Sequence, residues 1–98
     1  MRSNAIEISN LTFVAAAESD RSSGLLGFVS FVVGDTLRID GVTVRRTAAG
    51  KITLSFPQRT DRHGRRHAIV HPIDYEAQKR IERRVLEMLA HDLGGRHG

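Results

Sequence analysis

The spacing of the apolar residues changes once along this chain of 98 residues, and that change constrains the fold more than any other feature. Up to residue 56 apolar and polar residues alternate at a period of two, which is typical of strands that bury one face. From Tyr75 onward the period is 3.6, and the apolar stripe consists of Ala77, Ile81, Val85, Met88, Leu89 and Leu93. The pattern predicts an α+β fold, an antiparallel β-sheet followed by one C-terminal amphipathic helix.

Four strands are expected before Pro57, over residues 5–17, 25–33, 36–46 and 51–56. The first strand changes phase between Ile8 and Leu11, and Gly41 interrupts the third, so a bulge is expected in each. Gly34-Asp35 is a two-residue link of the kind that joins hairpin strands. Residues 25–33 are apolar at almost every position, which favours a well-buried strand.

The stretch from residue 58 to 66 has no apolar residue and is expected to be a loop that leads into a short last strand near Ala68. Asp74 is the expected N-cap of the helix, and Gly94-Gly95 its stop. We therefore expect about five antiparallel strands and one helix in a single domain, with residues 5–93 ordered and 94–98 as a tail.

One helix of this length covers only one face of such a sheet. The second strand is apolar on nearly every residue, so the other face also needs a cover. Self-association to a homodimer is therefore expected.

Composition narrows the functional class. The chain has no cysteine, which excludes disulfides and thiolate metal sites and fits a reducing compartment, so a cytoplasmic location is expected. Neither a signal peptide nor a membrane span is expected, because no long apolar run is present. Fifteen Lys and Arg against eleven Asp and Glu give a net charge of +4, and thirteen of those cations are Arg, whose planar fork fits phosphate oxygens and guanine edges.

The densest charge lies in residues 59–67, which hold four arginines, two histidines and a single opposing acid, Asp61. On a hairpin tip these arginines reach the phosphates or groove edges of a nucleic acid. The alternative is a polar turn that protects a sheet edge from aggregation, but that needs only one or two charges. The predicted nucleic-acid-binding residues are Arg59, Arg62, Arg65 and Arg66, extended by Arg45, Arg46 and Lys51 if the strands are neighbours.

Other chemistry is not expected. His63, His67 and His71 recur at every fourth residue, but on a strand they are spread too far for one metal ion, and His71 is expected to make a local hydrogen bond beside Pro72. No nucleophile with a base, paired carboxylates or phosphate-binding loop assembles, so neither an enzyme nor a cofactor or small-molecule substrate is expected. Single-strand recognition by stacking is disfavoured, since apart from Tyr75 the aromatic residues are four Phe, mostly at core positions.

The charges of the helix are interpreted as a solvated face. Four cations lie opposite the apolar stripe with Glu76, Glu82 and Glu87 interleaved, and Glu76 and Arg80 form an i,i+4 pair in the favoured order. A secondary phosphate contact is the weaker alternative.

Residues 54–73 resemble the signature region of the stage V sporulation protein G (SpoVG, septation protein) family. The resemblance rests on a strand ending in proline, a basic Arg-Thr, a glycine-containing hairpin, an arginine and a His-Pro-Ile ending, which here are Pro57, Arg59-Thr60, Gly64, Arg66 and His71-Pro72-Ile73. Residues 28–33 and 37–44 resemble the family's second and third strands. The chain departs from the family at Gln58, where a Lys is usual, and at the turn, where Asp61-Arg62-His63-Gly64 replaces Pro-Asp-Gly.

This resemblance implies a small dimeric sheet protein with a C-terminal helix that binds DNA, and RNA in some members, and regulates genes, with effects on septation and cell division in sporulating cells. It also implies binding by hairpin arginines, here Arg59, Arg62 and Arg66. The expected function is thus that of a nucleic-acid-binding regulator. The alternative is an adaptor in septation or division control, on which the same arginines dock an acidic protein partner.

Overall fold

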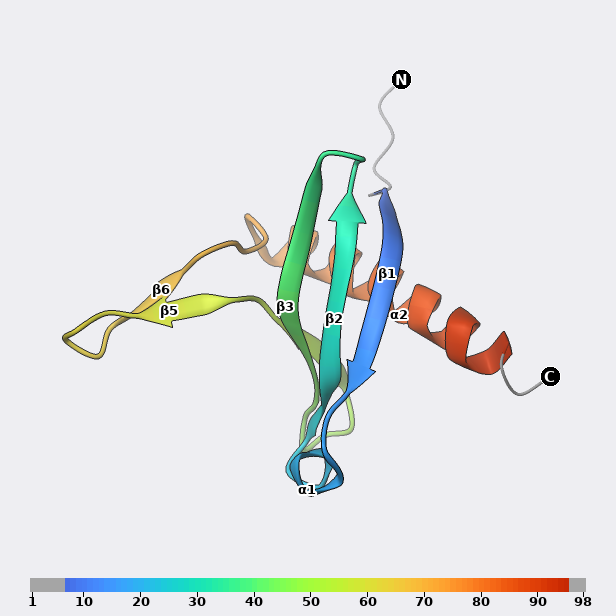
Figure 1. The fold of residues 1–98 in the computed structure, drawn as a ribbon, viewed down its shortest axis with the longest axis horizontal. Helices are drawn as coiled ribbons and strands as arrows, with labels where there is room; N and C mark the ends of the chain where they lie inside the picture. Colours follow the sequence, from blue (N-terminus) through green and yellow to red (C-terminus); the bar gives the residue numbers. More distant parts are fainter. Residues whose placement is uncertain (1–6, 96–98) are drawn as a thin grey trace.

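A computed structural model describes residues 7–95 of the chain and confirms the α+β architecture (Figure 1). The elements, in chain order, are β1 (Ile8–Ala15), α1 (Glu18–Arg21), β2 (Leu25–Val33), β3 (Leu37–Arg46), β4 (Ile52–Ser55), β5 (Gln58–Thr60), β6 (Arg66–Ala68) and α2 (Tyr75–Gly95). Strands β1 to β4 form an antiparallel sheet in the order β1-β2-β3-β4, and β5 and β6 form a separate two-stranded ribbon.

The turns and bulges of the main sheet confirm the sequence predictions. Gly34 and Asp35 both have positive φ, 57° and 56°, as a type I′ turn requires, and Thr36 N–H donates to Val33 O at 3.0 Å. The register of β1 against β2 shifts between Ser9 and Thr12, and that of β3 shifts around Gly41, whose φ is 74°. These irregularities keep several apolar residues of β1 and β3 on the face that carries the core, namely Ile8, Leu11, Phe13, Ile39, Val42 and Val44.

The last strand differs from the expectation in its partner. Instead of extending the sheet, it pairs with residues 58–60, which were expected to be loop. The backbone of Leu54 on β4 is bonded by helix side chains: its N–H donates to Glu82 Oε2 at 3.0 Å, and its carbonyl accepts from Gln78 Nε2 at 3.1 Å. A fifth strand therefore cannot pair with β4 at this position, and the chain folds back on itself. A second difference is α1, a single helical turn within the polar stretch expected to be a turn.

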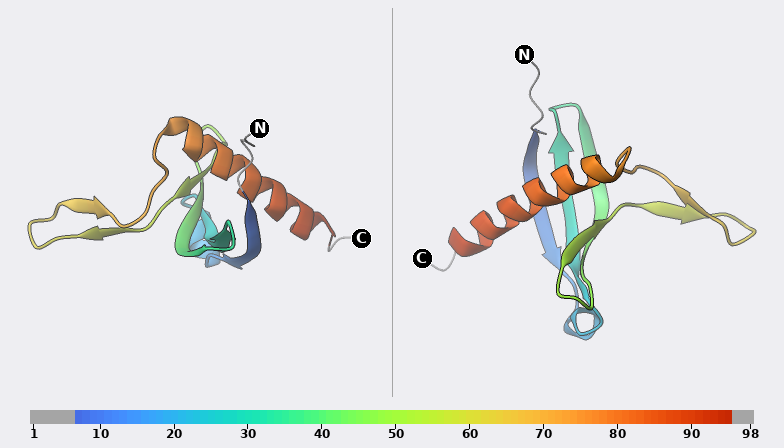
Figure 2. Two further views of the ribbon diagram at one scale, coloured as in Figure 1. Left: turned by 90° about the horizontal axis from the view of Figure 1, so that it is seen from above. Right: turned by 180° about the vertical axis from the view of Figure 1, so that it is seen from behind.

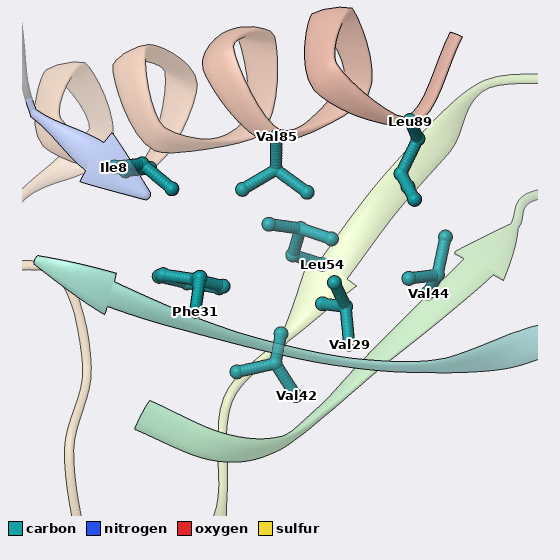
Figure 3. Close-up of a cluster of buried hydrophobic side chains, with 8 residues drawn as sticks. All are labelled: Ile8, Val29, Phe31, Val42, Val44, Leu54, Val85 and Leu89. Atoms are coloured by element: carbon teal, nitrogen blue, oxygen red, sulfur yellow. The ribbon is translucent and has the colours of Figure 1, made fainter. Parts of the chain in front are cut away.

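Helix α2 lies across one face of the sheet (Figure 2). Its N-terminus is capped as predicted, since Asp74 Oδ1 accepts from Ala77 N–H at 2.8 Å. Val85 and Leu89 point at the sheet (Figure 3) and complete a core with Ile8, Val29, Phe31, Val42, Val44 and Leu54. The helix ends at the predicted glycine pair, while the Leu93 side chain and the expected tail at residues 96–98 lie outside the described part of the structure.

The opposite face of the sheet is not covered by α2. Val14 and Phe28 face each other across β1 and β2 on this side, and they are 65% and 41% exposed. No helix among residues 7–95 is long and apolar enough to cross a membrane.

Candidate nucleic-acid interface

The ribbon of β5 and β6, together with its turn at residues 61–65, projects from the body as an arm (Figures 1 and 2). We call residues 58–68 the arm. Its two strands pair with each other and with no other described strand, and all six strand residues are exposed. In its register Arg59 is opposite His67 and Thr60 is opposite Arg66. Because side chains alternate between the faces of a strand, Arg59 and Arg66 lie on opposite faces of the ribbon.

Asp61 holds the tip of the arm in shape. Its Oδ1 accepts from the backbone N–H groups of His63, at 2.8 Å, and Arg65, at 3.0 Å. Its Oδ2 lies 2.8 Å from His67 Nε2, which must be the donor because a carboxylate only accepts. These bonds, that of His67 first, lower the pKa of Asp61 from its ordinary value, so the carboxylate is ionised at neutral pH. Both oxygens of the one acid in the arm are thus engaged within the turn.

The structure brings together four of the seven predicted site residues. Arg59, Arg62, Arg65 and Arg66 are exposed on the arm, and none of them forms an ion pair with a carboxylate among the side chains described, those of residues 7–91. Asp61 is the one acid in the arm against four arginines, so the arm keeps a net positive charge.

Arg45, Arg46 and Lys51 do not join this surface. Strands β3 and β4 are neighbours, as the expected extension required. However, Arg45 and Arg46 end β3 beside the start of β4, and Lys51 directly precedes β4, whereas the arm follows the end of β4. Arg46 N–H donates to Gly24 O at 2.7 Å, which places this group beside α1 (Figure 1). All three side chains are exposed, and together they form a basic group separate from the arm.

The three histidines have separate surroundings. His67 contacts Asp61, and His71 Nδ1 donates to Pro72 O at 2.7 Å, which confirms the predicted local hydrogen bond. In the part of the chain that the structure describes, no three His, Cys, Asp or Glu side chains lie close enough to hold a metal ion.

Glu82 corrects the interpretation of the helix as a simple solvated charged face. It is 5% exposed and turns toward the sheet, where it accepts from Leu54 N–H, from Gln78 Nε2 at 2.7 Å and from Lys79 Nζ at 3.3 Å. Burial raises its pKa, but these donors outweigh that effect, and the pKa lies below its ordinary value. The ion pairs among the described helix residues are Lys79–Glu82 and Arg84–Glu87, and not the expected pair of Glu76 with Arg80.

Exposed apolar side chains at the root of the arm were not expected. Ile69 is 62%, Ile73 86% and Tyr75 72% exposed, and Lys79 Nζ lies 5.2 Å from the centre of the Tyr75 ring. An open groove between the end of β4 and the segment that follows β6 has an apolar lining of Leu54, Phe56, Ala68, Val70 and Pro72, together with polar side chains. Residues 68–70 are all apolar in the sequence, and such a run does not show whether its side chains are exposed.

Sheet, covering helix and basic arm define a class of small α+β proteins that present a charged β-ribbon to solvent. The model of the SpoVG family matches residues 6–91, and the chain belongs to that family. Membership supports a regulatory role of the SpoVG type. A comparison with curated proteins finds no match.

Proposed function

We propose that this SpoVG-family protein is a cytoplasmic regulator that binds nucleic acid, DNA and in some settings RNA, through the arginines of the arm, and that it is not an enzyme. The observation that carries the proposal is the set of four exposed arginines, without carboxylate partners among the described side chains, on an arm whose turn is held by Asp61. Family membership supports the regulatory part of the proposal.

The chemistry of the arm fits a polyanion. A guanidinium fork binds phosphate oxygens with two parallel hydrogen bonds, and a fixed turn loses little conformational freedom on binding. Arg45, Arg46 and Lys51 supply a second, separate contact in this proposal.

The test is fluorescence anisotropy of the full chain with labelled duplex DNA and with RNA at several salt concentrations. Two to four phosphate contacts predict a slope of log K against log salt of about −2 to −4 for each arm, because each contact releases counterions. Failure to bind either nucleic acid at low salt would contradict the proposal. Capture of an acidic protein partner would then favour the adaptor function.

The uncovered face of the sheet supports the proposal that the protein is a homodimer. Val14 and Phe28 form an apolar centre there, and burying it against a second copy would remove it from water. Two arms, one on each subunit, would then raise affinity through effective concentration.

We expect wild-type protein to show a dimer mass by size exclusion with light scattering, and Phe28→Asp to show a monomer mass, since the substitution buries an unpaired charge. Leu37→Asp is the matched control, because Leu37 is 60% exposed near the β2–β3 turn and should leave the mass unchanged. Monomeric wild-type protein at tens of micromolar concentration would contradict dimerisation.

A further inference from the structure

We propose that the arm enters the major groove of duplex DNA tip first, with each face of the ribbon directed at one of the two phosphate backbones. This inference rests on the proposed function and names its ligand. It starts from the register of the arm, which places Arg59 and Arg66 on opposite faces. A ribbon that lay flat on a surface would present one of these arginines to the ligand and turn the other away.

The width of the arm fits one groove and not the other. The relevant width runs from one face to the other, because the faces are directed at the two backbones. Stacked sheets pack about 10 Å apart, so a ribbon with side chains on both faces is about 10 Å thick and fits the B-DNA major groove, about 12 Å wide. The minor groove, about 6 Å wide, is too narrow for it. Both faces of the ribbon are open, because all six residues of β5 and β6 are exposed and the ribbon projects from the body (Figure 2).

The depth of the groove matches the spacing of the arginines. Arg59 lies two residues behind Asp61, or about 7 Å at 3.3 Å per residue, and the turn extends beyond Asp61. The major groove is about 8.5 Å deep, so when the tip reaches its floor Arg59 and Arg66 lie near the level of the phosphates. Arg62 and Arg65, at the tip, then face the base edges, where guanine offers two acceptors to a guanidinium.

The tip is suited to insertion because its shape is fixed before binding. The backbone N–H groups of His63 and Arg65 and the ring of His67 bond to the Asp61 carboxylate and keep it within the turn. A-form RNA has a deep, narrow major groove that side chains cannot read, so the same arm fits duplex DNA and not duplex RNA.

Blocking each groove in turn tests this geometry. The probes are one GC-containing duplex, the same duplex with glucosylated hydroxymethylcytosine, which fills the major groove without added charge, and duplex RNA of the same sequence. We expect binding at least about tenfold weaker for the glucosylated duplex and for the RNA, and a change below about twofold when netropsin fills the minor groove of an AT-containing duplex. Equal affinity for the glucosylated duplex, or displacement by netropsin, would overturn the groove assignment while leaving nucleic-acid binding intact. Absence of binding to any probe would overturn both.

Single substitutions test the two-faced contact. Arg59→Ala and Arg66→Ala should each weaken DNA binding about three- to tenfold and lower the salt slope by about one, and the double variant should combine both losses. Arg83→Ala, at an exposed position of α2, is the control and should change little. If only one of the two arm variants loses affinity, the ribbon lies flat and the proposal fails.

Discussion

Replacing Arg59, Arg62, Arg65 and Arg66 together by alanine is expected to weaken binding to duplex DNA by on the order of 100-fold or more near physiological salt. The salt slope should fall by at least about two, because the phosphate contacts of Arg59 and Arg66 are lost. All four side chains are exposed on an arm outside the main sheet, so the core should stay folded. Anisotropy titrations at several salt concentrations measure both quantities, and urea unfolding checks the fold.

The matched control removes the same charge elsewhere. The variant with alanine at Arg21, Arg38, Arg80 and Arg83 also loses four positive charges, at exposed positions outside the arm. If binding depends on net charge alone, both variants will lose affinity equally, and the arm is then not the site. A loss confined to the arm variant assigns the site to the arm.

Local signals predicted much of the fold. Gly34-Asp35, Gly41 and Asp74 each act through their own backbone conformation or a hydrogen bond three residues away, and all three do what the sequence indicates. The partner of the last strand was not predictable in this way. It depends on Gln78 and Glu82, which are more than twenty residues from Leu54 in sequence and occupy its backbone groups in space.

The candidate site was also predictable only in part. The arginines of residues 59–66 are close in sequence, and a hairpin keeps them close in space. Arg45 and Lys51 were grouped with them by charge, but the direction of β4 carries the chain away from that group before the arm begins. The position of Glu82 could have been predicted from the sequence. Together with Gln78, Val85 and Leu89 it follows the helical period of the buried stripe, which places its carboxylate on the apolar face of the helix.

Glu82→Ala is expected to lower the free energy of unfolding by about 3 kcal/mol, because it leaves the Leu54 N–H and the Gln78 amide without their acceptor in a buried place. Urea titration at pH 7 measures this loss. Glu87→Ala is the matched control: Glu87 is an exposed acid on the same helix, paired with Arg84 at 3.6 Å, and its loss should change stability by less than about 0.5 kcal/mol.

The pH dependence separates the charge from the packing of Glu82. Its folded pKa is below the ordinary 4.5, so its stabilising contribution is fully present above that value and is lost as pH falls through the lower folded pKa. The difference in stability between wild type and Glu82→Ala should therefore be constant from pH 7 to about 5 and shrink in more acidic solution. Glu82→Gln keeps one acceptor oxygen without the charge, so we expect a smaller loss of stability than for Glu82→Ala at pH 7. Neither variant titrates at residue 82, so the difference in stability between these two variants should not vary with pH. If the difference in stability between wild type and Glu82→Ala also does not vary with pH, the ionised carboxylate does not hold the β4 edge.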